Sequence, residues 1–288
     1  MKPLIVIVGE TASGKSEVAI DLAVKLNGEI INADSWAVYR EFNLGTAKPS
    51  DDDQKRIKHY LIDIADPREG FSAARFKKLA TDAMSEIYKK DKVPIIVGGT
   101  GLYIDSIVYD YSFLPPSSKL DRKYYDSLSL SELVKMCKKL GYDSKKIDMN
   151  NKRRVIRLLE NKGAYPKSKP LRKNTLIIGI GLDAVKLEGN IRKRTQTMLD
   201  NGLENEVKVL VNKYGWEIEP LKGIGYREFK DFFDDKIDKL ELAERINIDT
   251  LKLVKKQRTW FKRNKSIQWL YNREIIVEIA TTFLNKFN

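Results

Sequence analysis

The sequence predicts an α/β fold in which a parallel sheet is covered by helices on both faces. Short apolar runs alternate with helical patterns through the first third of the chain, and this alternation is typical of such sheets. The predicted strands, in chain order, are residues 4–8, 29–32, 60–64, 93–97 and 175–181. The predicted helices between them include residues 15–26 and 73–90. Ligands of parallel sheets bind beyond the carboxyl ends of the strands, so a site is expected in the loops there.

The loop after the first predicted strand carries the most informative motif. Residues 9–16 have the sequence Gly-Glu-Thr-Ala-Ser-Gly-Lys-Ser, which fits G-x-x-x-x-G-K-[ST] between a strand and a helix. Backbone N–H groups of such a loop point at phosphate oxygens, and the next helix adds the positive end of its dipole. Lys15 adds a charge and Ser16 a hydroxyl for Mg²⁺. The predicted fold is therefore P-loop NTPase-like, and the predicted diphosphate-binding residues are Gly9, Thr11, Ala12, Ser13, Gly14, Lys15 and Ser16.

Two further loops are expected at the same edge of the sheet. Asp34 follows the second predicted strand and could act as a general base, or it could cap a helix starting near Ser35. The strand at 93–97 ends in Gly-Gly-Thr-Gly, where most phosphate-loop NTPases carry an acidic residue that helps to hold Mg²⁺. Asp63 could replace that residue or be an ordinary strand-end residue. The missing carboxylate favours an enzyme that uses the loop for another phosphate-leaving reaction over a hydrolytic motor or switch.

The composition changes after residue 114. Residues 115–172 are polar, Lys-rich and helical in pattern, so we predict a helical insertion into a core formed by residues 1–114 and 173–288. The charge is also uneven, because residues 1–110 hold 15 Lys and Arg against 17 Asp and Glu, and the rest of the chain holds 38 against 23. Either the back half has ordinary solvated helix faces, or it binds a polyanion, with nucleic acid the first candidate.

The composition as a whole is that expected of a cytoplasmic protein. Hydrophobic content of 42% and charged content of 32% are typical of globular proteins. No apolar run approaches the roughly 20 residues that span a bilayer, and the N-terminus is predicted to be the first strand and not a signal peptide. The single cysteine, Cys137, excludes an intramolecular disulfide, and the single histidine, His59, excludes a His cluster. We expect a monomer that does not bind membranes.

A basic and aromatic segment lies near the C-terminus. Residues 255–263 surround Trp260 and Phe261 with lysines and arginines. The segment could contact nucleic-acid phosphates while its rings stack on bases, or it could be an amphipathic helix that buries both rings.

Eight motifs together cover nearly the whole chain. They are residues 9–16, Ala33-Asp34-Ser35, Gly45-Thr46-Ala47-Lys48-Pro49, residues 59–63, Val97-Gly98-Gly99-Thr100, residues 153–160, Ile224-Gly225-Tyr226-Arg227-Glu228, and Gln257-Arg258-Thr259-Trp260-Phe261. In this order they resemble the tRNA dimethylallyltransferase family, bacterial enzymes that isopentenylate the adenosine beside the anticodon.

The resemblance implies a substrate pair, a cofactor and a set of site residues. The donor would be dimethylallyl diphosphate, bound by the phosphate loop with Mg²⁺, and the acceptor N6 of the adenosine 3′-adjacent to the anticodon. Asp34 matches the family's general base, Thr100 a residue of the reaction channel, and Arg194 one that clamps the diphosphate. Positions that match tRNA contacts are Asp34, Ser35, Trp36, Ala37, Arg122, Arg153, Arg154, Arg157, Gly223, Gly225, Tyr226, Arg227, Lys255, Lys256, Gln257, Arg258 and Trp260.

Two departures from the family pattern concern the same site. Glu10 stands where relatives have proline in the phosphate loop, and we expect its side chain to point outward. Asn190 stands where relatives have arginine, so one interaction with phosphate or tRNA is either missing or taken over by Arg192.

Three other functions fit parts of the sequence. A transferase of the same fold could act on free adenine nucleotides, and a small-molecule kinase could use ATP through the same loop. A non-catalytic RNA-binding protein could use the basic back half alone.

Overall fold

The computed structural model describes residues 1–115, 118–142 and 147–287, and the chain divides into two compact units. The first unit is Met1–Val108 with Leu171–Asn288, and the second is Tyr109–Pro170. Among the described residues, no helix combines the length and the apolar character needed to cross a membrane.

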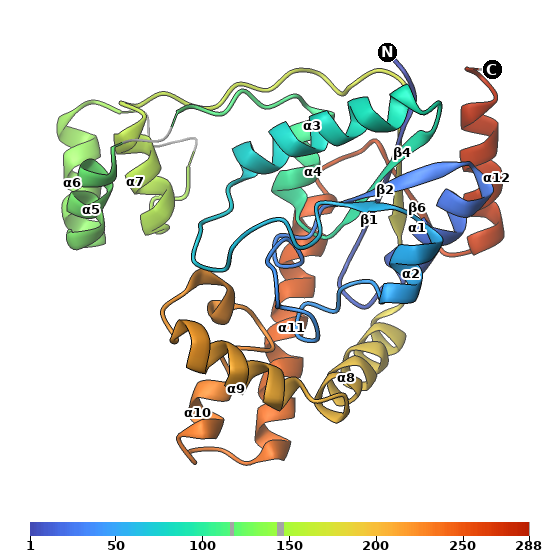
Figure 1. Ribbon diagram of the computed structural model, residues 1–288. Coiled ribbons are helices and arrows are strands. Elements are labelled where there is room, and N and C mark those ends of the chain that lie inside the picture. Colours follow the sequence, from blue (N-terminus) through green and yellow to red (C-terminus); the bar gives the residue numbers. More distant parts are fainter. Residues whose placement is uncertain (116–117, 143–146, 288) are drawn as a thin grey trace. The chain divides into compact units, whose positions relative to one another are not determined.

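The first unit is built on one parallel sheet, as predicted (Figure 1). Its strands are β1 (Leu4–Gly9), β2 (Gly28–Asn32), β3 (His59–Tyr60), β4 (Val93–Gly98), β5 (Thr175–Ile180) and β6 (Ile267–Leu270), in the order β3-β2-β4-β1-β5-β6. The edge strand β6 was not predicted, and β3 is shorter than predicted because Leu61 and Asp63 have positive φ angles of 65° and 56°. Asp63 therefore does not end a strand.

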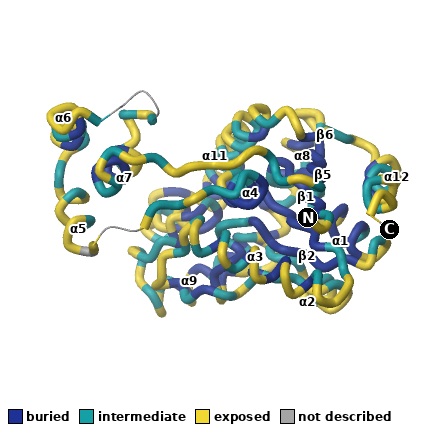
Figure 2. The backbone as a smooth tube through the Cα atoms, turned by 90° about the horizontal axis from the view of Figure 1, so that it is seen from above, coloured by how far each residue is buried: buried dark blue, intermediate teal, exposed yellow. Residues whose placement is uncertain are grey.

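Helices cover both faces of this sheet. The helices of the first unit are α1 (Lys15–Lys25), α2 (Asp51–Arg56), α3 (Ala73–Lys89), α4 (Gly101–Val108), α8 (Ala184–Asp200), α9 (Leu203–Tyr214), α10 (Phe229–Phe233), α11 (Lys239–Phe261) and α12 (Arg273–Leu284). Ile5 and Ile7 of β1 pack in one core cluster with α1 and α12, while α3, α4 and α11 contact the sheet too. Figure 2 shows β1, β2 and β5 buried beneath these layers.

A second hydrophobic cluster supports the ligand side of this unit. Val38, Tyr39 and Phe42, from the chain after β2, pack with residues of α8, α9 and α11. The Phe42 and Tyr226 rings lie 5.0 Å apart between centroids. This cluster holds the loop that carries the Gly-Thr-Ala-Lys-Pro motif against the C-terminal helices.

The second unit is helical, with its own small core. It contains α5 (Lys119–Ser127), α6 (Leu130–Lys139) and α7 (Lys152–Glu160). Ser129 and Glu132 form a capping box that begins α6, and Leu133 and Cys137 of α6 pack against the apolar face of α7. The basic residues of α7 lie on its other faces.

Candidate active site

The strand order brings three loops of the first unit together. Strands β2, β4 and β1 are neighbours and run parallel, so their carboxyl ends meet at one edge of the sheet. The phosphate loop follows β1, Asp34 follows β2, and Thr100 follows β4. The hydroxyl of Thr100 accepts a hydrogen bond from the Ser35 backbone N–H at 3.1 Å, and this bond joins two of the loops.

The phosphate loop has the curled backbone that its glycines permit. Gly14 has φ 83° and caps α1, and the Ser13 N–H donates to the Glu10 carbonyl oxygen at 3.2 Å. A Cβ at Gly9 would lie 2.8 Å from Ser13 Oγ and 3.1 Å from the Ile180 carbonyl oxygen, so this position requires glycine. Lys15 Nζ donates to the Glu10 carbonyl oxygen at 3.1 Å, which holds the ammonium at the loop.

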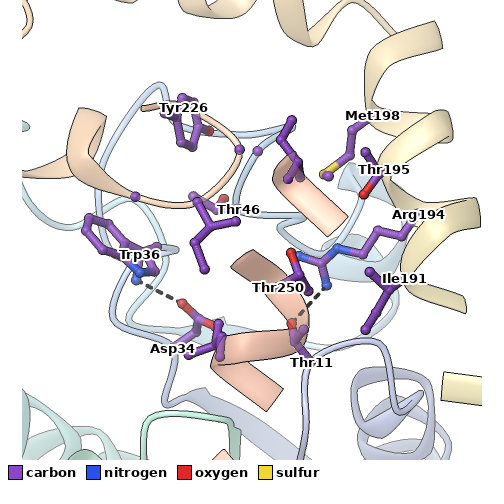
Figure 3. A pocket seen from close by; sticks show the side chains of 16 residues that line it. Thr11, Asp34, Trp36, Thr46, Ile191, Arg194, Thr195, Met198, Tyr226 and Thr250 are labelled. Carbon is purple, nitrogen blue, oxygen red and sulfur yellow. Dashed lines mark hydrogen bonds between the residues drawn. The ribbon is translucent and has the colours of Figure 1, made fainter. Parts of the chain in front are cut away.

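A small cavity opens beside this loop (Figure 3). It measures about 70 Å³, and Thr11, Asp34 and Arg194 reach it from three different elements. A neighbouring cavity of about 60 Å³ is lined by Asp34 and Arg194 as well, together with Lys15 and Ser16. All three predicted kinds of residue, the base, the diphosphate clamp and the phosphate loop, are thus brought to one place.

Two partly buried cations dominate the electrostatics of the site. Burial lowers the pKa of Lys15 to about 8, against the opposing effect of the Asp34 charge. Burial also lowers the pKa of Arg194, which Asp34 again opposes. Arg194 Nη1 lies 3.4 Å from the hydroxyl of Thr11. A bound anion would relieve the unfavourable burial of both cations, so the site is suited to a phosphate or diphosphate group.

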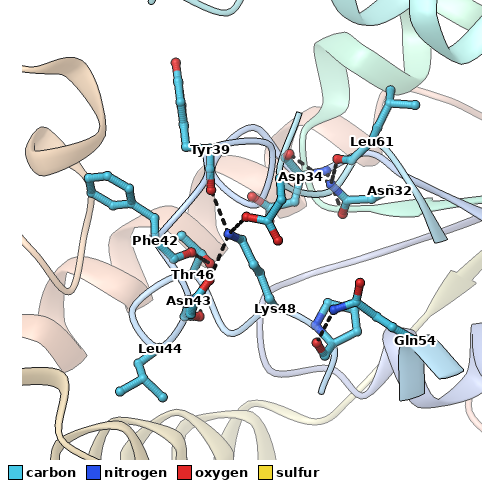
Figure 4. Close-up of polar contacts among 12 residues, drawn as sticks. Asn32, Asp34, Tyr39, Phe42, Asn43, Leu44, Thr46, Lys48, Gln54 and Leu61 are labelled. Atoms are coloured by element: carbon cyan, nitrogen blue, oxygen red, sulfur yellow. Dashed lines mark hydrogen bonds and ion pairs between the residues drawn. The ribbon is translucent and has the colours of Figure 1, made fainter. Parts of the chain in front are cut away.

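Asp34 is held in a turn and does not cap a helix. Its Oδ1 accepts a hydrogen bond from the Trp36 backbone N–H at 2.8 Å, and no helix begins at Ser35. The Asn32 side chain supports the same turn, since its Oδ1 accepts from the Asp34 N–H and its Nδ2 donates to the Asp34 carbonyl oxygen, each at 3.3 Å (Figure 4). The capping alternative is therefore wrong, and the carboxylate is positioned at the cavity by local hydrogen bonds.

Glu206 anchors the loop on the other side of the cavity, and the sequence did not single it out. Its carboxylate accepts from the Leu44 N–H at 2.9 Å and from the Tyr226 hydroxyl at 2.7 Å. Lys48 supports the loop from within, because its Nζ donates to the Tyr39 carbonyl oxygen at 2.7 Å (Figure 4). An acidic residue in the first turn of α9 looks like ordinary dipole stabilisation, so only the fold reveals the role of Glu206.

The expectation that Glu10 points outward is wrong. Its side chain is buried, and Oε1 accepts from Arg258 Nε of α11 at 2.7 Å. The Asn190 departure also has a structural answer, because Asn190 Nδ2 donates to the Ala12 carbonyl oxygen of the phosphate loop at 3.1 Å. Arg192 pairs with Glu188 and Glu244.

The positions predicted to contact tRNA fall into three groups. Trp36, Gly223, Gly225 and Tyr226 line the Asp34 cavity, and Ala37 lines its neighbour. They would meet an acceptor that enters the site.

The second group lies on and around α11. Lys255 and Lys256 are exposed, whereas the side chains of Gln257 and Arg258 bond to the phosphate loop. Trp260 Nε1 donates to Asp105 at 2.9 Å, and Phe261 is buried, as the amphipathic alternative predicts for that ring. Arg227 pairs with Glu228 and with Asp249 of α11.

The third group lies in the second unit. Arg153 and Arg154 are exposed on α7. Arg122 and Arg157 both pair with Glu160, at 3.4 and 3.1 Å. The Arg122 guanidinium therefore joins α5 to α7, whereas the Arg157–Glu160 pair lies within α7.

The fold and the site together define an α/β protein with a phosphate loop, suited to an anion, beside a positioned carboxylate. The model of the IPP transferase family matches residues 37–264, and the chain belongs to this family of prenyltransferases. The match begins after the phosphate loop, so that motif does not contribute to it.

Curated relatives and solved structures agree with this assignment. A tRNA dimethylallyltransferase of Anoxybacillus flavithermus is 38% identical over 92% of this chain and 89% of its own. One of Acetivibrio thermocellus is 37% identical over 95% and 93%. The crystal structure of a tRNA isopentenylpyrophosphate transferase of Staphylococcus epidermidis matches with a TM-score of 0.75 and 34% identity over the whole of both chains. A eukaryotic dimethylallyltransferase acting on tRNA matches with a TM-score of 0.80 and 26% identity, over 94% of this chain and 74% of that one.

Proposed function

We propose that this protein transfers the dimethylallyl group from dimethylallyl diphosphate to N6 of the adenosine 3′-adjacent to the anticodon of tRNA. The observation that carries the proposal is the meeting of Asp34, Lys15 and Arg194 at one pair of cavities. The names of the relatives support this donor and this acceptor class. The site combines two cations for the diphosphate with a carboxylate for the N6 proton.

The proposed reaction replaces a carbon–oxygen bond of the donor with a carbon–nitrogen bond to the acceptor, and one proton is transferred. The N6 amine attacks the allylic carbon, the bond from that carbon to the diphosphate oxygen breaks, and diphosphate leaves with the electron pair. Lys15, Arg194 and the loop N–H groups stabilise the growing negative charge on the leaving group. The proton displaced from N6 passes to the Asp34 carboxylate, which the Trp36 N–H holds in place.

The donor set of the loop fits Mg²⁺. Among the described residues, no group of three or more His, Cys, Asp or Glu side chains could hold a metal ion by itself. Mg²⁺ takes few protein ligands and keeps waters or phosphate oxygens as the others, so the Ser16 hydroxyl and the diphosphate would hold it. It would supply further positive charge to the leaving group.

The acceptor adenosine must present the base-pairing edge of its adenine to the site. N6 lies on the pairing edge of adenine, so the base has to leave the stack of the anticodon loop to reach Asp34. Trp36 and Tyr226 line the cavity at which it would arrive. The basic residues of the back half would hold the phosphates of the loop, the usual way in which unpaired RNA is bound.

Release of diphosphate with different acceptors tests this proposal. The protein is incubated with dimethylallyl diphosphate and Mg²⁺, and with unmodified tRNA, AMP or no acceptor. We expect diphosphate to be released only when tRNA is the acceptor. Release with AMP at the same rate would instead favour the free-nucleotide transferase. Transfer of the γ-phosphate of ATP to a small-molecule acceptor in a parallel incubation, with no diphosphate released from dimethylallyl diphosphate, would favour a kinase.

A further inference from the structure

Gln257 of α11 joins two of the loops at the site. Its Oε1 accepts from the Thr11 backbone N–H at 2.9 Å, and its Nε2 donates to the Gly99 carbonyl oxygen at 3.2 Å. A Cβ at Gly99 would lie 2.3 Å from the same Nε2, so any side chain there would displace the Gln257 amide. Both the oxygen and the nitrogen of the Gln257 amide are thus hydrogen-bonded to backbone groups of the protein.

Arg258, the next residue, contributes a charge to the phosphate loop. Its Nε donates to Oε1 of Glu10 at 2.7 Å, and the Glu10 side chain is only 4% exposed against 38% for Arg258. A buried carboxylate without a partner is strongly destabilising. Within a loop that binds an anion, its charge would also repel the ligand. Arg258 removes both difficulties, because the pair is neutral.

We propose that Arg258 and Gln257 are positioning residues for the diphosphate of the donor, and that Glu10 makes the loop of this protein depend on Arg258. The inference rests on the proposed function for the identity of the donor. Gln257 and Arg258, which match tRNA-contacting positions in the sequence, are thereby reassigned to the diphosphate. The contact with RNA on this part of α11 is left to the exposed Lys255 and Lys256.

Charge balance predicts an unusual pattern of variants. Arg258→Gln leaves the Glu10 carboxylate unpaired in the phosphate loop, so the loop should bind diphosphate more weakly. Glu10→Gln leaves only the arginine charge, which attracts an anion. The double variant Glu10→Gln/Arg258→Gln has no charge at either position, so diphosphate affinity should return toward that of the natural chain.

Calorimetric titration with inorganic pyrophosphate measures this pattern without turnover. We expect Arg258→Gln to weaken pyrophosphate binding about tenfold, Glu10→Gln to bind at least as tightly as the natural chain, and the double variant to bind within about threefold of it. Lys252→Gln, which removes an exposed charge from the same helix, is the matched control and should leave the affinity unchanged. The melting temperature of each variant checks the fold.

Measurement of tRNA affinity distinguishes a role of Arg258 in positioning the diphosphate from a role in contacting RNA. A fall in tRNA affinity in Arg258→Gln with pyrophosphate binding unchanged would overturn the inference, and so would a double variant no better than Arg258→Gln alone. A protein that binds pyrophosphate in the expected pattern but transfers no prenyl group would contradict the proposed function and leave the pairing intact.

Discussion

The two units of the chain use basic residues in opposite ways. In the first unit, Lys15 and Arg194 are partly buried. Both lie close enough to Asp34 for the charge of Asp34 to raise their pKa values, against the effect of burial. In the second unit, Arg153 and Arg154 are exposed on α7, above a small apolar core.

The difference follows from the two partners that the charges would meet. A cation that is shielded from solvent gains most from an anion that enters the site, because little water screens the interaction. An exposed arginine meets an RNA phosphate that keeps part of its hydration, so each contact is weak and depends on salt. Variants of the partly buried Lys15 and Arg194 should therefore affect the chemistry, and variants of the exposed Arg153 and Arg154 should affect tRNA affinity.

The largest effect is expected from Asp34→Asn. Asparagine can still accept the Trp36 N–H bond that holds the turn, but it cannot take a proton from N6. We expect turnover to fall about 10³-fold, with tRNA affinity within about twofold as measured by filter binding. Turnover like that of the natural chain would refute the base assignment.

A smaller effect is expected from pH, through Lys15. The pKa of Lys15 is about 8, so the ammonium is charged below that pH and loses its proton as the pH rises through it. Pyrophosphate affinity should therefore fall by up to about tenfold per pH unit above about pH 8.

Titration of Lys15→Gln controls for the ionisation of pyrophosphate itself. This variant should bind more weakly at all pH values and lack the additional fall. An equal pH dependence in both proteins would show that Lys15 does not titrate in this range.

The smallest effect is expected from Arg153→Gln/Arg154→Gln in the second unit. We expect tRNA affinity to fall several-fold, and the slope of the salt dependence of binding to decrease by about one for each RNA phosphate that is no longer bound. The KM for dimethylallyl diphosphate should stay the same. Lys138→Gln/Lys139→Gln, on the exposed end of α6, is the matched control. An equal loss of affinity in both double variants would indicate general charge attraction and no specific contact.

The sequence predicted the parts of this site that are encoded locally. The phosphate loop and its flanking strand and helix lie within 22 consecutive residues, from Leu4 to Lys25, and the position of Asp34 at the sheet edge follows from the strand before it. The edge strand β6 is four residues long, with no strong pattern to reveal it.

Contacts between distant residues could not be predicted from local pattern. The Glu10–Arg258 pair joins residues 248 positions apart, and the bonds of Glu206 to the loop at Leu44 span 162. From sequence alone, a carboxylate such as Glu10 in a phosphate loop is expected to be exposed, because its partner Arg258 is far away in the chain. Only the packing of α11 beside the loop supplies that information.

We propose that the phosphate loop binds a prenyl diphosphate whose allylic carbon is transferred to RNA. Deuterium-labelled dimethylallyl diphosphate, incubated with the protein, Mg²⁺ and unmodified tRNA, tests this most directly when the tRNA fragments are analysed by mass spectrometry. We expect one labelled five-carbon group on N6 of the adenosine that follows the anticodon. Label on no nucleoside would contradict prenyl transfer to RNA.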